Sequence, residues 1–422
     1  MEITGLRRGT GDGAVRQETA GKAFAFDTPQ AAIAALVERL SPVGTELVRA
    51  EAGVGRVLAQ PVHADRPSPP CDVSAMDGYA IRVADIHLGR LPVCDEALPG
   101  KPPPSIPAAG AIRIFTGGPV PNGADAVIPR EDLVELPDGI ELPPGQGAQS
   151  SQHIRRRGEN CKEGESVVSA GSAINAPAFA ALAAFGIRDV LVYKPIRITL
   201  IVTGNEIRTP QADVEPWELR DSNGPALAAM FGRHTAWARW LDIAYVTDDP
   251  SSLRVTVDRL LPESDVLLLT GGVSMGNYDF VPRIVAEAGC RVLFHGLPVR
   301  PGKPVLGAIG PGGQAVLGLP GNPMAALTMA RVFGAPALRR RAGFAPPNCP
   351  TPSVSTTEGG RNQLPMYCYK PVKITAPGRA ELVKNQGSAD FVGGARSDGF
   401  IEMPPGADGP GPWPFYRWNL EE

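Results

Sequence analysis

Segments typical of β-strands alternate with segments typical of α-helices between Ile196 and about Pro336, and this alternation constrains the fold more than any other feature of the sequence. Helices are expected after Ser222, from Ser251, through Ile284 and after the last strand. The expected strands are 197–202, 243–246, 265–270 and 314–319. Such an order is typical of a three-layer α/β/α domain, in which helices cover both faces of a mostly parallel sheet. Ligands of such sheets bind at the carboxyl ends of the strands.

The segments before this sheet predict an elongated unit with an insertion. Thr28 and Pro29 are typical of a helix start, and apolar side chains at 33, 36, 37 and 40 then share one helical face. From about Val62 to Ser151, short apolar runs are broken by proline-rich turns, which predicts a small β domain. Helical sequence resumes at 176–185. The β domain is therefore expected to be inserted into an elongated helical and β unit.

The segment after the sheet predicts one more β domain, because 354–414 is alternating and turn-rich and follows a proline-containing linker at 345–347. A sandwich would share this pattern, and we expect a small barrel. The fold class expected for the whole chain is multidomain α/β plus β. The expected boundaries are a disordered tail at 1–24, a helical and β linker domain at 25–61 and 152–195, the inserted β domain at 62–151, the α/β domain at 196–340 and the C-terminal β domain at 346–422.

The charge and the residue composition limit the kinds of ligand that the protein is expected to bind. The 422 residues carry a net charge of −3, which argues against nucleic acid as the main ligand. No apolar run approaches the ~20 residues that a membrane span needs, and the first 20 residues lack the apolar core of a signal peptide. The six cysteines contain no Cys-x-x-Cys pair, and the five histidines show no ligand spacing. We therefore expect a cytoplasmic protein that binds small molecules and has neither a zinc ribbon nor a disulfide framework.

Two glycine-rich turns follow apolar strands. Gly271, Gly272 and Ser274 follow the strand at 265–270, and a second turn at 319–323 follows the next strand. Glycines let backbone N–H groups converge on an anion at a helix start, so a phosphate or oxyanion site is one interpretation. The other is structural, because a strand that reverses tightly needs glycine anyway. No Gly-x-Ser-x-Gly elbow, Walker loop or dinucleotide fingerprint is present.

Charged residues near these turns suggest what the ligand is. Arg300 and Lys303 stand three residues apart on the rigid frame of Pro301 and Gly302, which favours an anionic ligand. Carboxylates recur at strand ends and in turns, namely Asp77, Glu206, Asp221, Asp248, Asp249 and Asp279. Such hard oxygen ligands suit Mg²⁺ shared with substrate phosphates, although each acid alone is also a common turn former or helix cap. The basic run 155–157 is either a salt-bridged strand edge or a ligand or interdomain contact.

Nine short motifs occur along the chain in a fixed order, and together they point to a family that no single motif would identify. They are DVSAMDGYA at 72–80, IFTGGPVP at 114–121, IRRRGE at 154–159, TGNE at 203–206, DSN at 221–223, DDP at 248–250, GGVS at 271–274, PGKP at 301–304 and GLPGNP at 318–323. In this order the chain resembles the molybdopterin molybdenumtransferases, the MoeA family of molybdenum-cofactor biosynthesis, from about Thr28 to Pro405. Arg300 stands where that family often has lysine, and 361–366 lacks a phenylalanine and a second arginine that often occur there.

The resemblance implies an elongated homodimer with a composite active site. The inserted domain of one chain, with Asp77 and Thr116, would face the α/β and C-terminal domains of its partner. The catalytic residues implied by position are Asp77, Thr116, Glu206, Asp248, Asp279 and Lys303. The substrate-binding residues implied are Gly271, Gly272, Ser274, Arg300, Pro301, Gly302 and Ser388. The metal ligands implied are Asp77, Glu206 and Asp279.

The activity implied is Mg²⁺-dependent insertion of molybdate into adenylylated molybdopterin, with release of AMP. A molybdopterin adenylyltransferase is an alternative, because a related α/β domain serves both steps. A scaffold that binds a peptide of another protein is a second alternative, which the intact acids and Lys303 argue against. Further partners implied are the adenylyltransferase and proteins that receive or handle the cofactor, with no nucleic acid and no membrane.

Overall fold

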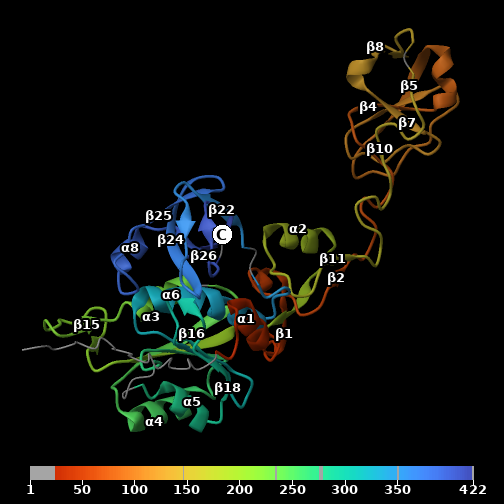
Figure 1. Cartoon of the computed structure of the whole chain (residues 1–422). Coiled ribbons are helices and arrows are strands. Elements are labelled where there is room, and N and C mark those ends of the chain that lie inside the picture. The colour runs from red at the N-terminus through yellow and green to blue at the C-terminus, as the bar shows by residue number, and fades with distance from the viewer. Residues whose placement is uncertain (1–23, 146, 233–234, 275–278, 349–350, 421–422) are drawn as a thin grey trace, which may run out of the picture.

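The structure is a computed structural model that describes residues 24–145, 147–232, 235–274, 279–348 and 351–420. Figure 1 shows a small β lobe, with β4, β5, β7 and β8, held well apart from the rest of the molecule. The predicted disordered tail lies outside the described residues, except for Phe24. In the described part, no helix is long and apolar enough to cross a membrane.

The central sheet has the strand order β16-β13-β17-β21-β20-β18. The strands β13 (Ile196–Thr203), β16 (Ala238–Val246), β17 (Val266–Thr270) and β21 (Ala315–Leu319) are parallel, as predicted. The strand β20 (Leu306–Ile309) pairs antiparallel with β21 and with β18 (Arg291–His295), so the sheet is mixed. These last two strands were not predicted.

Helices cover both faces of this sheet because its strands are apolar on both sides. Along β17, Val266 and Leu268 contribute to one core cluster, and Leu267 and Leu269 to another. The first cluster includes α3 (Asn223–Met230), α6 (Pro323–Met329), the π-helical turn Ala330–Gly334 and α7 (Ala335–Arg341). The second includes α4 (Pro250–Leu260) and α5 (Val281–Glu287). The sheet is therefore the middle layer of three.

The linker region lies next to the sheet and is built from the segments of the chain that precede and follow the inserted lobe. Helix α1 (Pro29–Val37) begins where predicted, and Thr28 Oγ1 accepts a hydrogen bond from Ala31 N at 3.2 Å. The linker region also contains β1 (Thr45–Arg49), paired with β12 (Asp189–Tyr193), and α2 (Ala176–Ala184), whose start was also predicted. Two short ribbons lead to the lobe: β2 (Val62–His63) pairs with β11 (Ser166–Val168), and β3 (Val73–Ser74) with β10 (Ile154–Arg155).

The lobe is built on a second six-stranded sheet, in the order β7-β4-β6-β5-β9-β8. Its strands are β4 (Gly78–Ile81), β5 (Arg90–Ala97), β6 (Ala111–Ile114), β7 (Ala126–Pro129), β8 (Val134–Leu136) and β9 (Gly139–Glu141). Along β4, Tyr79 and Ile81 join one core cluster and Ala80 another. The sheet is therefore covered on both faces.

The C-terminal part is a closed barrel, which confirms the expectation of a barrel over a sandwich. The ring runs β24-β25-β22-β28-β26 and closes through the β24–β26 pairing. Its strands are β22 (Ser353–Thr356), β24 (Tyr367–Ala376), β25 (Arg379–Leu382), β26 (Gly399–Met403) and β28 (Trp413–Arg417). The short strand β19 (Val299–Arg300) pairs in parallel with the start of β24 and so attaches the barrel to the α/β part.

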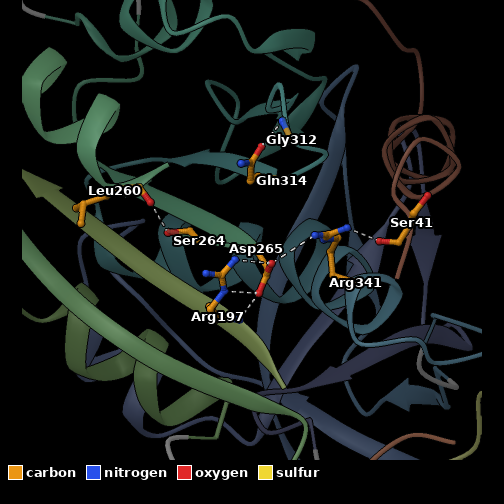
Figure 2. A network of polar contacts seen from close by, with 8 residues as sticks. All are labelled: Ser41, Arg197, Leu260, Ser264, Asp265, Gly312, Gln314 and Arg341. Carbon is orange, nitrogen blue, oxygen red and sulfur yellow. Dashed lines mark hydrogen bonds and ion pairs between the residues drawn. The ribbon is translucent and has the colours of Figure 1, made fainter. Parts of the chain in front are cut away.

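An ionic network around the buried Asp265 and Arg341 ties the amino ends of the central strands to the linker (Figure 2). Asp265 Oδ2 accepts hydrogen bonds from Arg197 N at 2.8 Å and Nε at 3.0 Å. Arg341 Nη2 lies 3.5 Å from Asp265 Oδ1, and Arg341 Nη1 donates to the carbonyl of Ser41, just beyond α1. The network therefore joins β13, β17, α7 and the end of the first helix at one point.

Candidate functional site

The carboxyl ends of four central strands lie side by side. Thr203 pairs with Val246, Val202 with Thr270, and Thr270 with Leu319. The turns that follow these strands, 204–206, 247–249, 271–274 and 320–323, therefore meet at one edge of the sheet. We call this the carboxyl edge. It is opposite to the Asp265 network.

The turns after β13 and β16 are fastened to each other. Asn205 N donates to Asp248 Oδ2 at 3.2 Å, and Asp248 N donates to Asn205 Oδ1 at 3.0 Å. Glu206 is the next residue and is exposed. One carboxylate is thus fixed by the backbone, and the other is free to meet a ligand.

The first glycine turn has a conformational reason to contain glycine. Gly271 and Gly272 have φ values of 86° and 58°, and a Cβ on Gly271 would lie 2.6 Å from the carbonyl oxygen of Thr203. Gly271 N donates to Leu319 O at 3.3 Å, so this amide is not directed at an anion. Ser274 is exposed. The structural interpretation therefore accounts for both glycines, and Ser274 is the turn residue that faces solvent.

The second glycine turn joins the barrel to the edge. Asn322 Nδ2 donates to Ser388 Oγ at 3.0 Å, and Met324 N donates to Ser388 O at 3.0 Å. Asn223 Nδ2 donates to Gly321 O at 2.8 Å. Ser388, which is 66 residues from Asn322, thus reaches the edge in the same chain.

Asp221, which lies just before α3, orders the start of this helix. Asp221 Oδ1 accepts hydrogen bonds from Asn223 N at 2.9 Å and Gly224 N at 3.1 Å, and Tyr245 Oη donates to Asp221 Oδ2 at 3.1 Å. Burial, together with the neighbouring Asp221 carboxylate, raises the pKa of Tyr245 to about 12. Tyr245 is therefore a neutral hydrogen-bond donor at physiological pH.

Two buried polar atoms near the edge lack a hydrogen-bond partner among the described residues. They are Thr270 Oγ1, at the end of β17, and Asn223 Oδ1, and the two residues are only 1% and 7% exposed. Leaving such atoms unpaired costs about 1–3 kcal/mol each. Native proteins seldom leave this cost uncompensated.

The two cations reach the same edge. His295 at the end of β18 pairs with Leu306, and Leu306 with Gly318, so the loop 296–305 emerges beside the glycine turns. A His295 ring nitrogen lies 2.7 Å from Val273 O, within the first turn. Arg300 and Lys303 are both exposed on this loop.

The frame between the two cations is rigid. Gly302 has a φ of 106°, and a Cβ there would lie 2.4 Å from Met329 Cγ. Leu297 N donates to Lys303 O at 2.9 Å, which closes the loop. The frame therefore fixes the backbone from which Arg300 and Lys303 project.

Asp77 and Thr116 lie elsewhere, at the ends of β4 and β6 in the lobe. Thr116 N and Thr116 Oγ1 each donate to Asp77 Oδ1 at 2.7 Å. These two bonds hold the pKa of Asp77 below its usual range, with a smaller contribution from Arg113. Figure 1 shows the lobe far from the carboxyl edge of its own chain.

A single chain therefore brings together some of the predicted site residues and separates others. The residues at or beside the carboxyl edge are Glu206, Asp248, Gly271, Gly272, Ser274, Asp279, Arg300, Pro301, Gly302, Lys303 and Ser388. Asp77 and Thr116 are not among them. In the described part of one chain, no group of three or more His, Cys, Asp or Glu residues could hold a metal ion. The predicted ligands Asp77, Glu206 and Asp279 are therefore not assembled within one chain.

Residues that were not singled out as site candidates also shape the edge. Asn322 holds Ser388, Asn223 holds the backbone of Gly321, and Tyr245 holds Asp221. Asn223 and Asn322 lie within the DSN and GLPGNP motifs, whereas the only signal for Tyr245 is its position near the end of a strand. Among the described cysteines, Cys71, Cys94, Cys161, Cys290 and Cys368 are free.

The central domain has three layers, and its polar and charged residues gather at the carboxyl ends of the strands. The protein is therefore a multidomain α/β protein whose candidate site lies where open sheets bind their ligands. Comparison with known families gives two matches. Residues 27–186 match the MoeA N-terminal region (domain I and II), and residues 199–340 match a probable molybdopterin binding domain.

Curated relatives and solved structures agree with these matches. A molybdopterin molybdenumtransferase of Synechococcus elongatus is 32% identical over 367 residues, which is 84% of this chain and 89% of the relative. One of a Nostoc species is 34% identical over 322 residues, 74% and 72% of the two chains. The molybdopterin biosynthesis moeA protein of Pyrococcus horikoshii has a TM-score of 0.76 at 25% identity, covering 93% of this chain and 98% of that one. The chain belongs to the molybdopterin molybdenumtransferase family.

Proposed function

We propose that the protein inserts molybdate into adenylylated molybdopterin and releases AMP, at a site formed by the carboxyl edge of one chain and the lobe of a second chain. The observation that carries this proposal is the separation of the site residues. Eleven of them gather at the edge, whereas Asp77 and Thr116 are presented on a remote lobe of the same chain. A second copy, related by a two-fold axis, supplies what each chain lacks at its own edge.

Anion binding is assigned to the two cations. Molybdate is a tetrahedral dianion and the adenylyl pyrophosphate is negatively charged, so both suit a planar guanidinium at Arg300 and a point charge at Lys303. Neither cation has a carboxylate partner within 4.0 Å in the described part of the chain. Their charge is thus available to the substrate.

The chemistry that follows needs no change of oxidation state. As the two dithiolene sulfurs bind molybdenum, one molybdate oxygen leaves as water with the two thiol protons. Cleavage of the pyrophosphate bond consumes one water and yields AMP and the pterin phosphate. The residues of the edge lower the barrier by positioning these groups and by stabilising charge on phosphate oxygens. No covalent bond to the protein is required.

Magnesium is also part of the proposal. Glu206 and Asp279 of one chain and Asp77 of the other would hold the ion together with phosphate oxygens, a ligand set that suits Mg²⁺, and the ion would neutralise charge on the pyrophosphate. The lowered pKa of Asp77 keeps this carboxylate ionised for that role.

The decisive experiment mixes two inactive variants. Asp77→Asn and Lys303→Met should each abolish molybdate-dependent AMP release from adenylylated molybdopterin. When equal amounts are unfolded and refolded together, half of the dimers are hybrids, and each hybrid has one intact site, so about a quarter of wild-type activity should return. No recovery in hybrids that have been shown to form would refute a site shared between chains. Full activity of either variant alone would refute its assignment.

A further inference from the structure

The segment that precedes α1 lies against the loop that carries Arg300 and Lys303. The Phe26 ring meets the Phe294 ring of β18 edge to face, with centroids 6.2 Å apart at 83°. Phe24 lies beside Gly296, where an added Cβ would be 4.0 Å from Phe24 Cε1. Phe26 therefore anchors the segment on the sheet, and Phe24 is left to contact the loop.

Lys303 directs its ammonium group at this segment. Lys303 Nζ lies 5.7 Å from the centroid of the Phe24 ring, within the range of a cation–π contact. In the described part of the chain, Lys303 has no salt bridge. Phe24 is half-buried, although it stands at the edge of the described chain. An aromatic face is thus the contact that the structure gives to this ammonium group.

The choice of an aromatic partner has a chemical consequence. A carboxylate beside Lys303 would neutralise it and compete with an anionic substrate. A ring attracts the cation through its quadrupole but leaves the net charge in place. Lys303 needs such support, because its four-carbon side chain is flexible even though the loop fixes its backbone. Arg300, by contrast, lies on β19 and is paired with β24.

We propose that Phe24 is a positioning residue for substrate binding: it holds the Lys303 ammonium group at the carboxyl edge while leaving its charge free for the substrate anion. This proposal rests on the proposed function of Lys303. Phe24 lies just before the region 27–186 that matches the MoeA N-terminal region.

Kinetics of three variants test the role. Phe24→Leu keeps an apolar side chain but removes the ring, and we expect KM for adenylylated molybdopterin to rise about two- to fivefold with kcat unchanged, the pattern of lost uniform binding. Phe24→Trp keeps the ring and should retain the wild-type KM. Phe26→Leu keeps the Phe24 ring but loses the Phe294 contact, so it should lower thermal stability and raise KM by less than Phe24→Leu does. An unchanged KM in Phe24→Leu, or a Phe24→Trp variant that behaves like Phe24→Leu, would overturn the proposal.

Binding measurements separate this proposal from the proposed function. The Kd for adenylylated molybdopterin, measured by calorimetry without molybdate, should rise in Phe24→Leu but should not rise further when Phe24→Leu is added to Lys303→Met. Equal effects in both backgrounds would overturn the positioning role. If Lys303→Met binds and turns over like wild type, the proposed function of Lys303 fails, and the positioning role fails with it.

A readout independent of activity tests the contact itself. After reductive dimethylation of lysines, the NMR signal of Lys303, identified by its loss in Lys303→Arg, should be shifted upfield by the Phe24 ring. The signal should move to the position of an ordinary exposed lysine in Phe24→Leu. A signal that does not differ between the two proteins would overturn the contact, whatever the kinetics show.

Discussion

Replacing Asp265 by Asn should destabilise the α/β part of the molecule strongly. The Asp265 carboxylate pairs with Arg341, whose side chain is only 9% exposed. Burial lowers the pKa of Arg341, and the charge of Asp265 opposes this effect. Breaking a buried pair by removing one partner costs about 3–5 kcal/mol. We expect about 3 kcal/mol, near the lower limit, because Arg341 keeps its hydrogen bond to the Ser41 carbonyl.

A matched control lies on α4. Arg254 and Asp258 form an ion pair of 2.6 Å with side chains 37% and 48% exposed, so Asp258→Asn should cost less than about 1 kcal/mol. Urea unfolding followed by tryptophan fluorescence is suitable, because Trp237 and Trp240 lie in or beside the central sheet. Adding Arg341→Met to Asp265→Asn should recover much of the loss, since no buried charge then remains. Equal costs at 265 and 258, or no recovery in the double variant, would refute the reasoning.

Three further predictions concern single groups. Thr116→Val removes one hydrogen bond to Asp77, so the lowered pKa should rise and the acid limb of the activity profile should move to higher pH; a profile identical to wild type would contradict this. The folded-state pKa of Tyr245, about 12, lies above the unfolded value of about 10, so its stabilising contribution should be complete below pH 10 and lost as pH rises to 12. In Tyr245→Phe, the unfolding midpoint should therefore depend less on pH across this window than it does in the wild type. Gly302→Ala forces a Cβ against Met329 at a φ of 106° and should cost about 1–3 kcal/mol, measured by thermal unfolding, with raised KM.

The parallel strands β13, β17 and β21 were predictable because each contains an apolar run that is buried on both faces. Strand β16, at the edge of the sheet, is exposed or half-buried over most of its length, and only its residues 243–246 were predicted. The strands β18 and β20 were not. The first contains Arg291 and His295 at its ends, and the second contains Gly307, which is glycine because a Cβ there would lie 2.3 Å from Phe294 Cζ. A glycine selected by a tertiary contact weakens the local strand pattern, so propensity alone misses it.

The location of the candidate site was predictable from the rule that ligands bind at strand ends, but its contacts were not. The approach of Ser388 to Asn322 depends on how the barrel docks, through β19 and β24, and no local pattern encodes that docking. The two glycines of the first turn show why a motif alone leaves two interpretations open. Their positive φ and the close approach of Thr203 account for them without any ligand. The domain boundaries proposed from composition remain a prediction.

The ribbons between the lobe and the linker favour a second chain over bending as the way to complete the site. Besides the β3–β10 pairing, Asp72 accepts hydrogen bonds from Arg156 Nη1 and from Arg157 N, the latter at 2.8 Å. Although burial opposes it, these bonds hold the pKa of Asp72 below its usual range.

The basic run 155–157 therefore braces the ribbon, as the salt-bridge interpretation predicted. The proposed two-fold pair of chains would complete the site with these contacts and strand pairings unchanged. In the proposed dimer, two-fold symmetry would make the exchange reciprocal, so that both sites would be complete at once. Asp72→Ala should accordingly reduce AMP release by loosening the lobe, while leaving the binding of adenylylated molybdopterin to Arg300 and Lys303 at the edge nearly unchanged. Equal losses in binding and turnover would indicate that the ribbon acts on the edge of its own chain.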